Sequence, residues 1–196
     1  LGATRSEIDS VRGVQNTSSG KTGWAVSEYL YRMGHDVKVV HGETTTSSPT
    51  FLTDNIYRSD PVEMLESLLT IAKSQNAPDS WIHCAAVLDY VTTETSNEKV
   101  KSGNKNWSIN LVPSKKHIEE LSNLCDGATR IGFKLESNYD DAQLFASATE
   151  MLDKYQLDGV VANHIESLND SIPRAFWVDK KGEVTPLQDN LALAMI

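Results

Sequence analysis

The stretch 16–42 constrains the fold of this chain most, because a loop, a helix and a strand follow one another in it directly. Small hydroxyl residues and glycines occupy 16–23, and the apolar periodicity that follows predicts a helix over about 22–33. Gly34 closes this helix, and a buried strand is predicted over 36–42. A loop–helix–glycine–strand unit of this kind is typical of parallel α/β sheets.

The loop at the start of this helix is a candidate anion-binding site. A helix start leaves backbone N–H groups unpaired and carries a partial positive charge, and glycines let a phosphate approach the main chain. Gln15 stands where the Walker A motif requires its first glycine, and only Gly20 and Gly23 have the spacing of the dinucleotide fingerprint. We therefore expect phosphate binding by another route, with a Ser/Gly-rich helix cap that holds no ligand as the alternative.

Further helices and buried strands alternate along the rest of the chain, as in a layered α/β protein. Helices are predicted over 62–75, 116–124 and 140–155, and strands over 81–87, 129–133 and 159–163. A terminal β-hairpin is predicted from the strands 175–178 and 184–187, while 43–60 is expected to form a long connection. We expect a three-layer, Rossmann-like α/β sandwich with a mainly parallel sheet, in one domain over 1–196.

A polar segment interrupts this alternation. Residues 88–106 show little periodicity, and 107–112 alternate like a strand. Long irregular segments within a domain usually have a function. We expect 88–112 to form an arm or flap that extends from the sandwich.

The composition excludes several classes of protein. A net charge of −9 argues against a general binder of nucleic acid or of anionic membranes. No apolar run approaches the roughly 20 residues of a membrane span. Two distant cysteines, Cys84 and Cys125, indicate reduced thiols in a cytoplasmic protein, and the five scattered histidines show no metal-binding spacing.

Six short segments carry a resemblance to one enzyme family. They are Ile8–Arg12, Asn16–Gly23, Ala85–Tyr90, Glu98–Lys101, Ile131–Glu136 and Val161–Asn163. In this order, and over nearly the whole chain, they resemble phosphopantothenate–cysteine ligase, also called phosphopantothenoylcysteine synthetase. We expect the stand-alone form, because these 196 residues leave no room for the decarboxylase to which many bacterial versions are fused.

The resemblance implies a ligase reaction of coenzyme A biosynthesis. Such an enzyme activates the carboxylate of 4′-phosphopantothenate with a nucleoside triphosphate, and L-cysteine then attacks the acyl-nucleotide. CTP is expected rather than ATP, although both remain open, and Mg²⁺ is implied by the chemistry alone. The family also implies a homodimer, since the arm of one subunit completes the site of the other; neither nucleic acid nor a membrane is expected as a partner.

Three residues match catalytic positions of the family. Asn16 matches an asparagine that hydrogen-bonds the carbonyl of the acyl-nucleotide, with a simple turn or helix-cap residue as the alternative. Lys99 matches a lysine that reaches the triphosphate from the arm; the alternatives are that it is a solvated lysine in a polar loop or that Lys101 takes the role. Arg12 matches an arginine beside the phosphate loop, as an anion contact or as an anchor for Asp9.

The resemblance also implies residues that bind the nucleotide and the substrate. The nucleotide set comprises Ser18, Ser19, Gly20, His83, Cys84, Ala85, Asp89, Phe133, Lys115, Lys116 and Lys154. Asp89 has an ordinary strand-end aspartate as its alternative, and Phe133 has plain core packing. The substrate set comprises Asn16, Ala86 and Asn163. The lysines depart from the bacterial pattern, which leaves the triphosphate geometry open.

Two other functions compete with the ligase. A nicotinamide-dependent reductase is disfavoured by the missing glycine fingerprint and by the absence of a Tyr-x-x-x-Lys pair on a suitable helix. A non-catalytic regulatory relative is disfavoured because Asn16 and Lys99 are both present.

Overall fold

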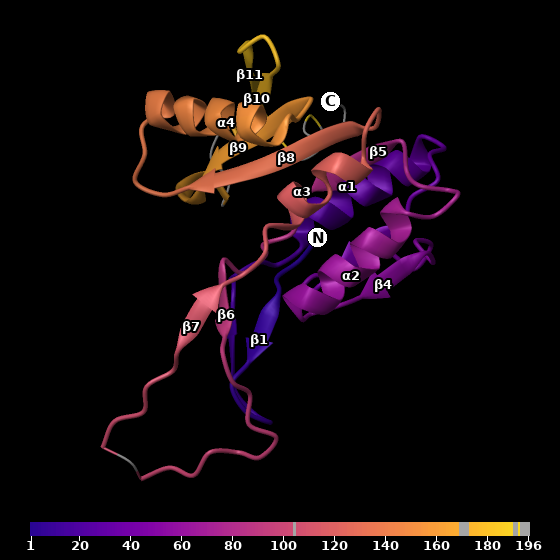
Figure 1. Ribbon diagram of the computed structural model, residues 1–196. Coiled ribbons are helices and arrows are strands. Elements are labelled where there is room, and N and C mark those ends of the chain that lie inside the picture. The colour runs from indigo at the N-terminus through magenta and orange to yellow at the C-terminus, as the bar shows by residue number, and fades with distance from the viewer. Residues whose placement is uncertain (104, 169–172, 190–191, 193–196) are drawn as a thin grey trace.

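A mainly parallel sheet runs through the main body of the molecule, and helices cover both of its faces (Figure 1). The computed structural model describes residues 1–103, 105–168, 173–189 and 192. Among these residues no helix combines the length and the apolarity needed to cross a membrane. The predicted three-layer, Rossmann-like sandwich is the fold observed.

Five strands form the continuous part of this sheet. Its order is β11–β10–β9–β8–β5. The strands β5 (Ser80–His83), β8 (Thr129–Glu136) and β9 (Gly159–His164) are parallel. The predicted hairpin of β10 (Ala175–Asp179) and β11 (Val184–Leu187) adds two antiparallel strands beside β9.

The first residues of the chain extend this sheet beyond β5. Residues 1–4 lie between Ala86 and β3 (Val39–His41): the amide of Ala86 donates to the carbonyl of Gly2 at 2.8 Å, and that of Gly42 donates to the carbonyl of Leu1 at 2.9 Å. Beyond them β3 pairs in parallel with β4 (Asn55–Tyr57).

Each face of the sheet packs against a different set of helices. On one face Val161 of β9 and Ala175 of β10 contact Val26 of α1 (Lys21–Arg32). On the other face the neighbouring residues Val160 and Val178 contact α4 (Asp141–Tyr155). Since successive side chains of a strand point to opposite faces, this alternation places α1 and α4 in different layers.

Smaller helical elements complete the α4 side. There α2 (Pro61–Ala72) packs with Trp81 of β5 and with the segment that contains α3 (His117–Glu120) and the 3₁₀ helix η1 (Ser122–Leu124). The carboxylate of Asp60 accepts hydrogen bonds from two backbone amides of the first turn of α2, which, with Pro61, explains where this helix begins.

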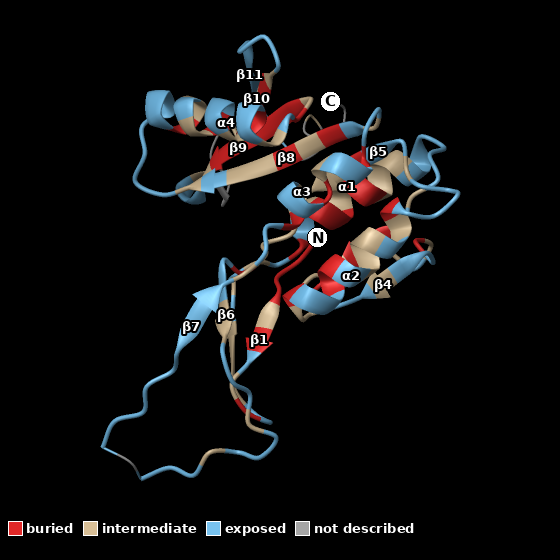
Figure 2. Ribbon diagram, viewed as in Figure 1, coloured by how far each residue is buried: buried red, intermediate tan, exposed pale blue. Residues whose placement is uncertain are grey.

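Two short hairpins project from the main body. The strands β1 (Arg5–Glu7) and β2 (Gly13–Gln15) form one, and β6 (Tyr90–Thr92) and β7 (Leu111–Pro113) form the other. Residues 93–103 and 105–110, called the arm loop here, extend beyond them (Figure 1). Figure 2 shows β7 and most of the arm loop exposed, in contrast to the buried β9.

Several predicted strands differ in extent from those observed. The strand expected over 36–42 is confined to β3, the one over 81–87 ends at His83, and the alternating segment 107–112 becomes extended strand only from Leu111. β4 lies inside the stretch 43–60 that was expected to be a connection. Only the central residue of β4 is half-buried, so this strand carries almost no hydrophobic signal.

Candidate functional site

Asn16 lies at the carboxyl edge of the sheet. Its side-chain Nδ2 donates to the carbonyl of Ala86 at 3.1 Å, and the same carbonyl accepts the backbone amide of Thr4 at 3.1 Å. An amide nitrogen carries two N–H donors, so this bond orients the group and leaves one donor for a ligand. Open α/β sheets bind their ligands at this edge. Asn16 and Ala86, two residues of the predicted substrate set, are thus brought together.

The loop Ser18–Gly20 leads from Asn16 into α1. The carbonyl of Ser19 accepts the amides of Thr45 and Thr46 at 3.2 and 3.1 Å, which holds the loop against the segment after β3. Gly20 has φ +74°, and a Cβ there would lie 2.5 Å from Thr44 Cγ2. Gly20 is the N-cap of α1 and makes no side-chain cap bond, while the amide of Lys21 donates to Ser19 Oγ at 3.3 Å. Backbone amides at such a helix start are suited to bind an anion that displaces the serine.

The neighbouring strand ends hold other predicted residues. His83 is the last residue of β5, so Cys84 and Ala85 directly follow the strand end. Asn163 is the next-to-last residue of β9, and it is buried. Phe133 of β8 packs in the core cluster on the α1 face, as its alternative of core packing requires.

Asp89 and Lys116 form an ion pair, although both were predicted to bind the nucleotide. Both side chains are at least half exposed, so solvent weakens their attraction. Lys115 is highly exposed and lies 3.8 Å from Glu120. Since the pair is exposed, a ligand that separates Asp89 from Lys116 can contact either side chain.

Lys154 lies apart from this edge. It stands in the last turn of α4, and Arg130, near the start of β8, donates to the neighbouring carbonyl of Tyr155 at 2.7 Å. Because α4 returns from the carboxyl end of β8 to the start of β9, its last turn lies at the amino ends of these strands. The structure therefore does not bring Lys154 together with Asn16.

Arg12 contacts Asp9, as one of its two predicted roles requires. Its Nε donates to Asp9 Oδ2 at 3.0 Å, and its Nη2 donates to the same oxygen at 2.5 Å. The Asp9 side chain is fully buried, and the bonds from Arg12 hold the pKa of this carboxyl well below its usual range. Lys99 is exposed on the arm loop, next to Val100, which also contacts this pair.

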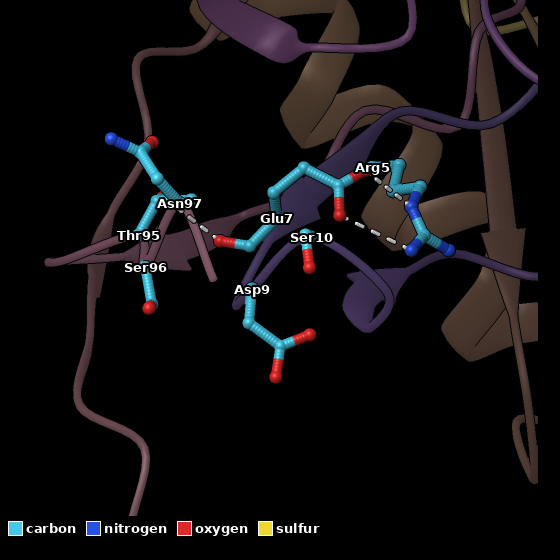
Figure 3. A pocket seen from close by; sticks show the side chains of 7 residues that line it. All are labelled: Arg5, Glu7, Asp9, Ser10, Thr95, Ser96 and Asn97. Carbon is cyan, nitrogen blue, oxygen red and sulfur yellow. Dashed lines mark hydrogen bonds and ion pairs between the residues drawn. The ribbon is translucent and has the colours of Figure 1, made fainter. Parts of the chain in front are cut away.

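A pocket of about 360 Å³ opens between the β1–β2 hairpin and the arm loop. Figure 3 shows its lining from both segments; the residues are Arg5, Glu7, Asp9, Ser10, Thr95, Ser96 and Asn97. The guanidinium of Arg5 contacts the carboxylate of Glu7 at 2.7 Å. No local pattern predicts this pocket, because its walls are joined by contacts between residues 88 positions apart, such as the Thr95 hydroxyl, which donates to the Glu7 carbonyl at 3.0 Å.

His83 is half-buried, and the Nε2 atom of its imidazole is inaccessible to solvent. Its Nε2 atom has no hydrogen-bond partner among the residues that the structure describes. Burial lowers the pKa of His83 to about 3, and the positive charge of Arg130 acts in the same direction. Burial also lowers the pKa of His117.

We expect the protein to lose stability as the pH falls from 7 to 5. The unfolded chain protonates His83 near pH 6.5, whereas the folded chain does so only near pH 3, so acid favours unfolding in this window. One such histidine lowers the free energy of unfolding by about 1.4 kcal/mol per pH unit. Urea unfolding at both pH values measures the loss.

His83→Gln should reduce this pH dependence, and the part due to His117 should persist. The matched control is His35→Gln at an exposed histidine, which should leave it unchanged. An equal loss of stability in His83→Gln and in the wild type would contradict the prediction.

Comparison with known proteins identifies relatives over nearly the whole chain. Coenzyme A biosynthesis bifunctional protein CoaBC of Thermococcus kodakarensis is 32% identical over 166 residues, which are 85% of this chain and 40% of that protein. The protein of the same name from Methanocaldococcus jannaschii is 33% identical over 164 residues, 84% of this chain and 39% of that one. The chain thus spans less than half the length of these relatives.

Solved structures share the fold. The DNA/pantothenate metabolism flavoprotein from Streptococcus pneumoniae superposes with a TM-score of 0.82 at 22% identity, covering 99% of this chain and 93% of that one. The C-terminal domain of CoaBC gives 0.76 at 26% identity, covering 99% and 87%. A Cab2 mutant in complex with phosphopantothenate-cysteine gives 0.72 at 20% identity, covering 95% and 78%.

A comparison with protein families matches nearly the whole chain. Residues 1–193 match the family described as DFP, the DNA/pantothenate metabolism flavoprotein C-terminal domain. The match includes the loop 16–20, the strand ends at Ala86 and Asn163, and the arm loop. On this evidence the chain belongs to the DNA/pantothenate metabolism flavoprotein C-terminal domain family.

Proposed function

We propose that this protein is an amide-forming ligase of coenzyme A biosynthesis. It activates the carboxylate of 4′-phosphopantothenate with a nucleoside triphosphate, CTP rather than ATP, and couples the product to L-cysteine. The observation that carries the proposal is the Asn16 amide held on the Ala86 carbonyl, beside the start of α1 at Gly20. The name of the CoaBC relatives and the phosphopantothenate-cysteine bound to a Cab2 mutant support the choice of pathway and substrates.

The first step makes the carboxyl group electrophilic. A carboxylate oxygen of phosphopantothenate attacks the α-phosphorus of the triphosphate, the bond to the β-phosphate oxygen breaks, and pyrophosphate leaves. Two anions must meet for this attack, so their charges need compensation. The amides of the first turn of α1 and the hydroxyls of Ser18 and Ser19 would supply donors for phosphate oxygens. Nucleotide binding would separate Lys116 from Asp89, freeing the cation for phosphate and the carboxylate for the base.

The second step forms the amide. The amine of cysteine attacks the acyl carbonyl, a proton leaves the nitrogen, and the carbon–oxygen bond to the nucleotide breaks. Negative charge develops on the carbonyl oxygen during the attack. The second N–H of Asn16 would donate to that oxygen without repelling the amine, in the manner of an oxyanion hole.

Lys99 would bring a further cation from the arm. A mobile ammonium group offsets the repulsion between the carboxylate and the triphosphate as they approach each other. In the proposed homodimer, this lysine serves the site of the other subunit.

The residues around the loop 16–20 do not build a site for Mg²⁺. Among the described residues, no three side chains of the metal-binding types gather closely enough to hold an ion, and Asp89 is paired with Lys116. Mg²⁺ is bound in many enzymes mainly by substrate phosphates and water. It would therefore arrive with the triphosphate, and none of the steps above depends on a metal held by the protein.

Pyrophosphate release tests the proposal. With phosphopantothenate and cysteine present, we expect continuous release with CTP and weaker release with ATP. Without cysteine, release should stop after about one equivalent per site, because the acyl-nucleotide stays bound. Equal rates with both nucleotides would refute the CTP preference alone. No release with either would refute the ligase and direct the search to nicotinamide binding or to a regulatory role.

A further inference from the structure

The backbone amide and carbonyl of Val100 both bond to one ion pair, that of Asp9 and Arg12. Its amide donates to Asp9 Oδ2 at 3.1 Å, and its carbonyl accepts Arg12 Nη2 at 2.7 Å. Since Arg12 also donates to Asp9 Oδ2, the three residues close a ring of hydrogen bonds. We call this arrangement the Val100 clamp.

The acidic half of the clamp is built to stay charged. Asp9 is fully buried, and besides Arg12 and Val100 its carboxylate accepts the amides of Val11 and Arg12, each at 2.9 Å. Hydrogen bonds to an ionised acceptor are stronger than neutral ones, and such bonds favour the ionised form. Trp107 adds a contact from the far side of the arm loop, because the Arg12 guanidinium lies 4.4 Å from its ring centre.

A second anchor holds the arm loop a few residues before Val100. The amide of Ser96 donates to the carbonyl of Ile8 at 3.0 Å, and Ser96 pairs with Asp9 in an isolated bridge. Lys99 therefore lies within a segment, 96–100, that is bound to the tip of the β1–β2 hairpin at both ends. Lys101 lies beyond the last of these backbone bonds.

We infer that Asp9 and Arg12 are positioning residues that present Lys99 to the reacting phosphates by fixing the backbone of Val100. This inference rests on the proposed ligase function and adds residues that act on the activation step through Lys99. The clamp depends on backbone groups of the arm, so it tolerates any side chain at 100. It depends strictly on the charge of Asp9 and on the forked donors of Arg12, which lysine cannot replace.

Hydrogen exchange tests the clamp without any assay of activity. Asp9→Asn keeps the size of the side chain and removes its charge. Arg12→Lys keeps the positive charge and removes the forked N–H donors of the guanidinium. Both variants should exchange the amides of peptides covering 96–101 roughly tenfold faster, with β8 and β9 unchanged. Glu7→Gln is the matched control, because it breaks an exposed ion pair in the same hairpin and should leave the arm protected.

The kinetics test the role of Lys99. In Asp9→Asn the rate constant for acyl-nucleotide formation should fall about tenfold, with little change in KM for the nucleotide. In a Lys99→Gln background the same substitution should have no further effect, because the group that it positions is gone. Independent, multiplying effects of the two substitutions would overturn the positioning role.

The possible failures can be told apart. Unchanged exchange at 96–101 in both variants would overturn the clamp, whatever the protein catalyses. Faster exchange of β8 and β9 as well would show general unfolding in that variant and would overturn a local role for the residue. Absence of pyrophosphate release by the wild type would refute the ligase, and with it the role of Lys99, whereas the exchange result would still decide whether the clamp exists.

Discussion

Asn16→Asp should stop the reaction after activation, with the acyl-nucleotide bound to the protein. The substituted carboxylate cannot donate to the carbonyl of Ala86 or to the oxygen of the acyl group, and it brings a negative charge to the place where negative charge must develop. Removing one donor of this kind lowers kcat by about 10²- to 10³-fold. Activation uses other groups, the start of α1 and the arm cation, so it should continue.

Rapid quenching followed by mass spectrometry measures the trapped species. We expect about one equivalent of pyrophosphate per site, an equal amount of acyl-nucleotide, and almost no amide product. Gln15→Glu is the matched control, since it adds the same charge at the exposed neighbouring position and keeps the bond to Ala86. Normal turnover by Asn16→Asp would remove Asn16 from the proposed mechanism.

Lys99→Gln should instead slow the first step. Glutamine keeps much of the length of the side chain but cannot compensate the charges of two anions, so acyl-nucleotide formation should fall by about 10²-fold or more. The measurement is the single-turnover rate of acyl-nucleotide formation with nucleotide in excess. The step in which cysteine attacks should be unaffected when preformed acyl-nucleotide is supplied.

Lys101→Gln is both the control and the competing candidate. Lys101 is exposed and lies outside the segment 96–100 that is bound at both ends, so its substitution should change the rate less than twofold, roughly the effect of one exposed charge. If the Lys101 variant loses activation and the Lys99 variant keeps it, the assignment of the two lysines must be exchanged.

The fold class could be predicted from the sequence because its long elements carry periodic signals. The bounds predicted for α1, α2 and α4 agree with the structure to within about three residues, since amphipathic spacing and the residues Gly34, Pro61 and Asp140 define their ends. β9 is buried along five of its six residues, and the first four of them, 159–162, are apolar or glycine.

The projecting hairpins could not be predicted in the same way. β1, β2, β6 and β7 have three residues each, and β7 is exposed throughout, so neither burial nor alternation marks them. What holds these strands is pairing between distant segments, such as the 2.8 Å contact between the hydroxyls of Ser6 and Thr92. Such contacts follow from the folded topology and leave no local pattern.

The candidate site likewise contains residues that could be predicted from the sequence and contacts that could not. Asn16 and the loop after it could be recognised from residue types and from the family resemblance, which the match over 1–193 confirms at the level of the family. The Val100 clamp uses backbone atoms of the arm, and the Lys116–Asp89 pair joins side chains 27 positions apart. Neither arrangement can be predicted from the spacing of residues in the sequence.

The β1–β2 hairpin connects Asn16 to the arm loop that carries Lys99. Its base ends at Gln15, directly before Asn16, and its tip at residues 8–12 holds the arm loop next to Lys99. In the proposed homodimer the hairpin therefore joins Asn16, which acts in one site, to the segment of Lys99, which serves the site of the other subunit. An insertion or deletion within 5–15 would change the position of Lys99 relative to Asn16. We therefore expect the length of this hairpin to tolerate change far less than the length of the arm loop.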